Sequence, residues 1–280
     1  INFIKKNPET HLFCMRGGKR SQIAKSWLNE AGIIVPTIDG GFKSLRNEAI
    51  NILQSVEHDT KDWIILGGRT GSGKTSILNK FKSSIDLEYH AKHRGSAFGN
   101  YVESQPSPID FENTLASKYF QQNNKTIFLE DESRRIGKLA IPIPWVQKMQ
   151  NSKLVIIDES LDERIKNIYN EYIYIPIKNG ISKNKLKESL KHSLFNIRKR
   201  LGPALYSQIN RQIEESLSNK QLNSSQNWIK NLLVNYYDPM YDYQLKTKMN
   251  RCILKDIKPN ILKYFKEVEE NQIFYDNLII

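Results

Sequence analysis

The chain has 280 residues, and its 42 Lys and Arg against 30 Asp and Glu give a formal net charge of +12. Hydrophobic residues make up 39% of the chain, a share that excludes wholesale disorder. The two cysteines, Cys14 and Cys252, exclude a disulfide framework and favour a reducing cytoplasm. No apolar run approaches the ~18 residues of a membrane span, so we expect no membrane partner. The basic balance points to an acidic partner, nucleic acid first.

Residues 1–56 are expected to form an incomplete domain that carries a cysteine loop. Apolar runs predict short strands at 11–13 and 33–35, and apolar residues at three- and four-residue spacing predict helices at 21–31 and 45–56. The chain opens at Ile1 rather than Met, so we expect that residues upstream complete this part.

Residues 57–179 show short apolar runs that alternate with helical stretches. This pattern predicts a parallel sheet with both faces covered, joined by right-handed crossovers. We expect its strands at 63–67, 84–88, 126–130, 153–158 and 172–175. Residues 180–280 are expected to be helical and basic, with 17 Lys and Arg against 10 Asp and Glu.

The run 64–75 has the spacing G-x-x-x-x-G-K-T between an expected strand and an expected helix. Glycines allow the tight turn that brings several backbone N–H groups onto one phosphate, and the helix adds its positive N-terminal end. The lysine supplies a point charge, and the hydroxyl of Thr75 is placed to hold Mg²⁺. The run therefore predicts a di- or triphosphate site, with a ligand-free glycine turn as the alternative. Its binding residues are Gly68, Gly71, Ser72, Gly73, Lys74 and Thr75.

A second, acidic position is expected on a strand beside this loop. Asp131 follows the expected strand 126–130, and Asp158 ends the expected strand 153–158. In kinase-like P-loop sheets the third strand lies beside the first, which favours Glu130 and Asp131. A carboxylate that caps the following helix is the alternative for either position.

Three further residues are expected to face the phosphates. The carboxyl ends of parallel strands line the ligand crevice, so Asp86 is placed there. His93 and Arg94 lie in the loop that follows and are suited to bind an anion. A solvated surface loop is the alternative.

The loop 14–21 places Cys14 between a strand and the start of a helix. Arg16, Lys19 and Arg20 surround it with positive charge, and the glycines at 17 and 18 let the backbone curl around an anion. These features all favour the thiolate, so we expect a reactive nucleophile. Cys252 lies in a helical pattern and is expected to be a small core residue. The catalytic residues predicted are Cys14, Arg16, Arg20 and Lys74.

The C-terminal region has two features that suit RNA. Residues 182–200 carry seven Lys and Arg against one Glu, which fits a phosphate backbone or else a solvated helix face. The aromatic run 236–243 fits base stacking, or equally a turn whose rings pack into the core.

These segments together resemble the tRNA 2-selenouridine synthase family of bacteria over nearly the whole chain. The loop 14–21 resembles that family's rhodanese site, and residues 39–42 resemble the closing turn of rhodanese domains. Segments 67–75, 86–88, 93–96, 105–107 and 129–137 resemble its P-loop domain, and 236–241 resembles its C-terminal signature.

The resemblance implies a transferase that acts on 2-thiouridine at the wobble position of tRNA. The protein would bind the tRNA through its anticodon stem-loop. The sulfur is first alkylated by geranyl diphosphate, and selenium from selenophosphate then displaces the geranylthio group. Cys14 is the residue implied for the selenium step, and the P-loop then holds the diphosphate of the prenyl donor. Family members have a complete rhodanese domain, so the resemblance also implies a missing N-terminal rhodanese half.

Three other functions fit parts of the sequence. A small-molecule kinase or ATPase would bind and consume ATP at the P-loop. A cysteine phosphatase would use the Cys-x-x-x-x-x-Arg spacing from Cys14 to Arg20, although no general-acid Asp can be placed. An RNA-binding adaptor would bind tRNA without forming a product.

Overall fold

The computed structural model describes residues 1–16, 18–99, 104–218 and 225–276. A parallel sheet lies at its centre, with the strand order β2-β3-β1-β6-β7, so the expected α/β class is confirmed. The strands are β1 (Asp62–Gly68), β2 (Ser84–Ile85), β3 (Thr126–Glu130), β6 (Lys153–Ile157) and β7 (Cys252–Asp256). A separate antiparallel pair is formed by β4 (Arg135–Ile136) and β5 (Leu139–Ala140).

Strand β1 is the centre of the sheet and ends in the phosphate loop. It pairs with β3 on one side, with Leu66 opposite Glu130, and with β6 on the other, with Gly67 opposite Ile156. The expected neighbour relation between the first and third strands is therefore confirmed. All three strands run the same way, so their carboxyl ends meet at the loop.

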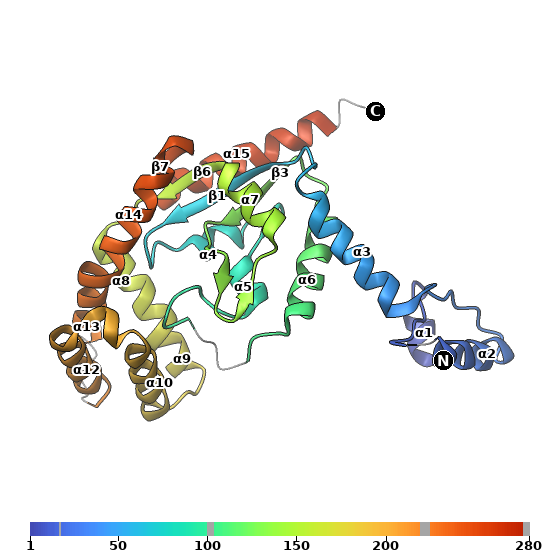
Figure 1. The fold of residues 1–280 in the computed structure, drawn as a ribbon, viewed down its shortest axis with the longest axis horizontal. Coiled ribbons are helices and arrows are strands. Elements are labelled where there is room, and N and C mark those ends of the chain that lie inside the picture. The colour runs from blue at the N-terminus through green and yellow to red at the C-terminus, as the bar shows by residue number, and fades with distance from the viewer. Residues whose placement is uncertain (17, 100–103, 219–224, 277–280) are drawn as a thin grey trace.

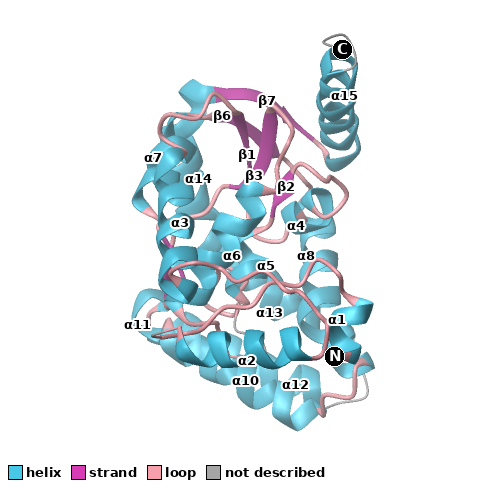
Figure 2. Ribbon diagram, turned by 90° about the vertical axis from the view of Figure 1, so that its right-hand side faces the viewer, coloured by secondary structure: helices cyan, strands magenta, loops and turns pink. Residues whose placement is uncertain are grey.

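The alternation of side chains along β1 divides its apolar residues between two cores. Trp63 and Ile65 pack against α3 (Gly41–Ser55), α6 (Pro108–Phe120) and α7 (Ile143–Asn151). Ile64 and Leu66 pack on the other face, against α4 (Lys74–Leu78) and α15 (Lys258–Asp276). Figure 2 shows the sheet between α15 on one side and α7 on the other.

A third core holds the helices that follow the sheet, together with Phe98 from the loop after β2. These helices gather on the side of the molecule away from α3 (Figure 1). None of the helices within the described residues is long and apolar enough to cross a membrane. The other helices that the described residues form after α4 are α5 (Leu87–Ala91), α8 (Leu161–Tyr169), η1 (Asn170–Tyr174), α9 (Ile175–Lys178), α10 (Lys183–Asn196), α11 (Arg198–Leu201), α12 (Pro203–Ser218), α13 (Ser225–Leu232), η3 (Leu233–Tyr237), α14 (Asp238–Lys248) and η4 (Met249–Arg251).

Two strands expected in the P-loop region differ in the structure. The expected strand 172–175 is wrong, because these residues continue from α8 as the π-helix η1 and then α9. Ile173 is buried there in the helical core, while Tyr174 and Ile175 are exposed, a pattern that suits a helix. The expected strand 84–88 stops after Ile85, because Asp86 accepts a hydrogen bond from Tyr89 N and starts α5.

The C-terminal region is not wholly helical, since β7 joins the sheet as its edge strand. It runs parallel to β6, with Leu154 opposite Cys252 and Ile157 opposite Asp256. Cys252 is therefore on a strand rather than in a helix, and it packs against the core on the α3 side. Helical periodicity missed this strand because its residues alternate between half-buried and exposed and are bordered by helices on both sides.

In the N-terminal part the expected helices are confirmed as α2 (Lys19–Glu30) and α3, after a short α1 (Asn2–Lys6). The strands expected at 11–13 and 33–35 are wrong, because the described residues of this part form only one parallel bridge, between Leu12 and Thr37. Helices α1 and α2 lie beyond the end of α3, away from the sheet (Figure 1). Trp27 and Ile34 are 68% and 89% exposed there, so this part leaves large apolar side chains uncovered.

Arg164 on α8 ties the phosphate loop to α14. Its Nε donates to the carbonyl of Thr70 at 2.9 Å, and its two terminal nitrogens bind the carboxylate of Asp238 at 3.1 and 2.5 Å. The Arg164 side chain is only 2% exposed. A bidentate pair in that setting is costly to break, because a lone buried charge remains.

We therefore expect Asp238→Ala to lower the free energy of unfolding by about 3–5 kcal/mol. Asp242→Ala is the matched control, because Asp242 also lies on α14 but is half exposed, and its partner Arg69 is partly exposed as well. That change should cost less than about 1 kcal/mol. Urea denaturation of both variants gives the comparison, and equal losses would contradict the role assigned to the buried pair.

Candidate functional site

The phosphate loop is held in shape from the side of α8. Arg164 binds the carbonyl of Thr70, and the side-chain amide of Asn167 donates to the carbonyl of Gly71 at 2.9 Å. The C=O and N–H of one trans peptide point in opposite directions, so the N–H groups that follow these carbonyls are turned away from α8. A side chain at Gly71, which has φ +82°, would meet the carbonyl of Arg164 at 2.8 Å. The loop therefore requires glycine there.

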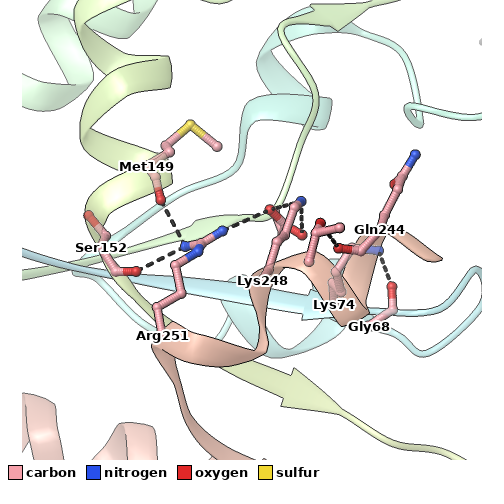
Figure 3. Close-up of polar contacts among 9 residues, drawn as sticks. Gly68, Lys74, Met149, Ser152, Gln244, Lys248 and Arg251 are labelled. Atoms are coloured by element: carbon pink, nitrogen blue, oxygen red, sulfur yellow. Dashed lines mark hydrogen bonds and ion pairs between the residues drawn. The ribbon is translucent and has the colours of Figure 1, made fainter. Parts of the chain in front are cut away.

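The loop borders a hollow of about 610 Å³, which we call the phosphate cavity. Lys74 begins α4 and lies in this cavity, with its Nζ 3.4 Å from the carbonyl of Gly68 (Figure 3). Burial works to lower the pKa of Lys74, but the ionisable oxygens of Tyr241, Glu88 and Glu132 raise it above its usual value. Lys74 therefore keeps its positive charge for an anion.

The structure brings half of the predicted phosphate residues to the cavity wall. Gly71, Gly73, Lys74, Thr75 and Arg94 line it. The guanidinium of Arg94 lies 4.7 Å from the ring centre of Tyr172, another wall residue. Positive charge thus reaches the cavity both from the loop and from Arg94, in the segment after α5.

The other predicted residues support the site from outside its wall. Ser72 is buried behind Gly68, where a Cβ would lie 2.7 Å from the Ser72 hydroxyl. Asp86 caps α5, and His93 is buried beside Gly137. Glu130 accepts hydrogen bonds from the N–H groups of residues 87 and 88, which adds a second cap to the same helix.

Asp131, the expected acidic partner of the loop, is occupied by cations of this chain. Lys248 Nζ lies 2.6 and 2.8 Å from its two oxygens, and Arg251 lies 3.7 Å away (Figure 3). Arg251 also donates to the carbonyls of Met149 and Ser152 at 2.9 Å. Within the described ranges, no cluster of three or more His, Cys, Asp or Glu could hold a metal ion. The charge of Asp131 is thus balanced by Lys248 at the strand end.

A pair of carboxyl groups, Glu88 and Glu132, lies beside Lys74. Both flank Gly95, whose Cβ, if present, would lie 2.6 Å from Glu88 and 2.9 Å from Glu132. Burial and the charge of Glu88 raise the pKa of Glu132 well above its ordinary range. Burial also raises the pKa of Glu88, while Lys74 and a hydrogen bond with Glu132 work to lower it. Both shifts disfavour a second negative charge in this carboxyl pair.

A larger hollow of about 1460 Å³, which we call the wide cleft, lies next to the phosphate cavity. Both hollows share Ser96 and Tyr241 in their walls, so they meet at these two residues. The aromatic run is thus partly core and partly cleft wall, with Tyr237 buried and Tyr243 73% exposed. The cationic and aromatic side chains of the cleft are Arg134, Arg200, Lys248, Arg251, Tyr236, Tyr237 and Tyr241.

The cysteine loop forms a separate site between α1 and α2. Cys14 is 7% exposed, and Gly18 starts α2 in a left-handed conformation. Hydrogen bonding from the backbone of Arg16, then of Ser21 and Arg20, and the charge of Arg20 lower the pKa of Cys14 to about 7 against the effect of burial. Gly17 lies outside the described residues. Cys14 is therefore roughly half thiolate at neutral pH.

Sequence reasoning missed several residues of the phosphate cavity and its supports. Glu132 lies in the segment 129–137 that carried the family resemblance, and its position after a strand end was a usable signal. Three other residues, Arg164, Lys248 and Tyr172, gave no signal in the sequence. Their hydrogen-bond partners lie 74, 117 and 76 positions away along the chain, respectively. Only the fold brings such residues together.

We expect the thiol of Cys14 to react with iodoacetamide along a curve whose midpoint is near its pKa of about 7. Alkylation should rise with pH, because the thiolate is the nucleophile. Cys252→Ser leaves Cys14 as the single thiol, and Cys14→Ser leaves Cys252 for comparison. Mass spectrometry of the modified protein measures both rates. A Cys14 midpoint at the ordinary thiol value of about 8.5 would contradict the stabilised thiolate.

Glu132→Gln should change how affinity for inorganic diphosphate depends on pH. Glu132 has a raised pKa, so its proton is present at low pH and is lost as pH rises through that pKa. A second negative charge then faces Lys74, and wild-type affinity should fall relative to the variant as the pH rises above the ordinary range of a glutamate. Isothermal titration calorimetry measures the affinity of both proteins at each pH. The ratio of the two affinities does not depend on the titration of the ligand itself, because the ligand is the same for both.

Glu163→Gln is the control for this comparison, because Glu163 is an exposed residue of α8 paired with Lys166. Its affinity ratio to wild type should stay constant with pH. A constant ratio for Glu132→Gln as well would show that the carboxyl pair does not act on the ligand.

Comparison with known proteins identifies the family of this chain. The sequence profile of the tRNA 2-selenouridine synthase AAA domain matches residues 61–272. The tRNA 2-selenouridine synthase of Shewanella pealeana is 39% identical over 91% of this chain and 73% of its own length. Those of Shewanella oneidensis and Shewanella halifaxensis are 36% and 40% identical, over 99% and 91% of this chain and 77% and 73% of their own lengths. No solved structure gives a significant match. The chain therefore belongs to the tRNA 2-selenouridine synthase family.

Proposed function

We propose that this protein converts 2-thiouridine at the wobble position of tRNA to 2-selenouridine in two steps, in the cytoplasm. The observation that carries the proposal is the junction of the phosphate cavity with the wide cleft at Ser96 and Tyr241. A diphosphate leaving group and an RNA base held in these two hollows would meet there. The relatives named above are tRNA 2-selenouridine synthases, which supports this reading.

The first step is alkylation of the sulfur by geranyl diphosphate. The C1–O bond of the donor breaks and leaves its electron pair on the diphosphate, while a sulfur lone pair forms the new C–S bond. The proton on N3 of the base passes to water. Lys74, Arg94 and the loop N–H groups stabilise the charge that develops on the diphosphate.

The wide cleft suits the anticodon stem-loop. Its cations match a phosphate backbone, and its tyrosines offer surfaces on which an unstacked base can lie. Lys248 and Arg251 hold Asp131 and also line this cleft, so their positive charge is fixed in place. Arg200 of α11 is one of the cations that line the cleft, and the basic helix α10 adds charge outside it.

The second step uses selenophosphate and the Cys14 loop. Selenium forms a bond to C2 of the base, and the geranylthiolate leaves with the electrons of the C–S bond and takes a proton from water. Hydrolysis of the Se–P bond then releases phosphate and leaves 2-selenouridine. The N–H groups at the start of α2 and the charge of Arg20, which stabilise the Cys14 thiolate, also suit the selenophosphate anion. Arg16 adds charge to the same loop.

Mg²⁺ at Thr75 stays a prediction. The Thr75 side chain lines the phosphate cavity, but Asp131, the acidic group expected to assist, binds Lys248 instead. The residues present therefore do not form a complete protein site for the ion, and no step is assigned to it. A kinase or ATPase would need the nucleotide as well, so ATP binding and turnover separate that rival from the present proposal.

The exposed apolar residues of the N-terminal part support a further element of the proposal. Trp27 and Ile34 leave much apolar surface in contact with water, which is unfavourable for a finished domain. We propose that an N-terminal rhodanese half covers this surface and completes the Cys14 site. Residues 1–56 then form part of that domain, 57–179 the P-loop domain and 180–280 the basic C-terminal region.

The direct test is mass spectrometry of nucleosides from tRNA that contains 2-thiouridine, after incubation with the protein, geranyl diphosphate and selenophosphate. A geranylated or selenated wobble uridine is the expected product. Geranylation without selenation would place the activity in the P-loop part alone. An unchanged nucleoside, from folded protein that binds the tRNA, would overturn the proposal.

Two substitutions should each affect one of the two steps and leave the other unchanged. Lys74→Ala should weaken diphosphate binding by about 10–100-fold, as expected for loss of one charged hydrogen-bond donor, and should reduce geranylation. Cys14→Ser should block selenium transfer and spare geranylation. Lys80→Ala, an exposed cation just after α4, and Cys252→Ser are the matched controls and should leave both steps unchanged. Loss of geranylation in folded Cys14→Ser protein would contradict this division.

A further inference from the structure

A second, apolar cavity opens beside the phosphate cavity. It contains about 330 Å³ of space and shares Thr70, Ser96, Ile168 and Tyr172 with the wall of the phosphate cavity. The two hollows therefore border on each other at these four residues, one with charged groups in its wall and the other with an apolar wall. The phosphate loop lies at the border between them.

The residues that belong to the apolar cavity alone come from the helical core. Phe98, Trp228 and Leu232 are among them, and the three side chains are 8%, 2% and 3% exposed. The rings of Phe98 and Trp228 lie 6.2 Å apart, centre to centre. Neither residue lines the phosphate cavity, so both belong to the part of the wall that the two cavities do not share. This part of the wall is thus aromatic and closed by packing.

Such a space selects a ligand with a charged head and a short hydrocarbon tail. A nucleotide fits poorly, because its sugar and base would bury polar groups against apolar walls without hydrogen bonds. Each CH₂ group of a hydrocarbon tail gains free energy when it leaves water for such walls. Diphosphate binding at the loop fixes where the tail starts.

We propose that the apolar cavity binds the prenyl tail of the diphosphate donor and that Phe98 and Trp228 limit its length. This inference rests on the proposed function and adds the residues that choose the donor. The tail then runs from the loop toward α13, while its first carbon stays at Ser96, the residue that lines the phosphate cavity, the apolar cavity and the wide cleft alike. The carbon that reacts is thereby placed where the RNA base arrives.

The experiment measures the binding of four ligands to the full chain by calorimetry. The ligands are inorganic diphosphate and the dimethylallyl, geranyl and farnesyl diphosphates. The wild type should bind geranyl diphosphate roughly tenfold or more tightly than inorganic diphosphate, since apolar pockets discriminate by about that factor per small group. Farnesyl diphosphate, with one more isoprene unit, should bind more weakly than geranyl.

Two substitutions test the wall from opposite directions. Trp228→Ala lengthens the cavity, so it should raise the affinity for farnesyl relative to geranyl diphosphate by roughly tenfold. Leu232→Trp fills the cavity, so it should remove the preference for geranyl over inorganic diphosphate. Leu190→Ala is the control, because Leu190 is buried in the same helical core but does not line the cavity. It should leave the order of the four ligands unchanged.

The outcomes separate this inference from the function on which it rests. If inorganic and geranyl diphosphates bind equally and no variant changes the order, the loop binds the head and the cavity assignment is wrong. If the wild type binds none of the four ligands, the proposed prenyl donor itself is wrong. Circular dichroism checks that each variant is folded, and Leu232→Trp tests the cavity should Trp228→Ala fail to fold.

Discussion

The buried guanidinium of Arg164 is the contact on which the phosphate loop depends. It holds the carbonyl of Thr70 with one nitrogen and the carboxylate of Asp238 with the other two. A glycine-rich loop has many accessible conformations, so the one that binds an anion must be fixed from outside. Here the outside support comes from a residue 94 positions further along the chain, which in turn is held by the start of α14. The conformation of the phosphate loop therefore depends on how the C-terminal region packs.

The C-terminal segment extends this support around the sheet. It places Asp238 under the loop and Tyr241 in the cavity wall, Lys248 and Arg251 at Asp131, and then adds β7 to the edge of the sheet. The phosphate cavity, the apolar cavity and the wide cleft are consequently walled by segments from both halves of the chain. Under the proposed reaction, Ser96, which lines all three hollows, marks the place where the donor and the acceptor meet.

Sequence reasoning succeeded where the signal was local. The strand, loop and lysine at 64–75 follow one another directly, and the position of β3 beside β1 follows from the common order of such sheets. It failed at 172–175, because alternating Tyr and Ile fit a strand as well as a helix, and only packing against the helical core decides. The Asp131–Lys248 pair spans 117 positions, so no pattern along the chain could indicate it. The raised pKa values of Glu88 and Glu132 likewise arise from burial, which composition does not reveal.

Helix α3 carries the cysteine loop outward, beyond the body that contains the phosphate cavity (Figure 1). Under the proposed reaction, one wobble base must visit both places, and no rigid docking of the stem-loop on this chain serves them together. The geranylated RNA is therefore an intermediate that must move between the two sites. It either reaches the selenium site or dissociates into solution. The balance between these two routes depends on how long the RNA stays bound relative to the supply of selenophosphate. A shortage of selenium would then appear in the cell as free tRNA that bears a lipid-like group.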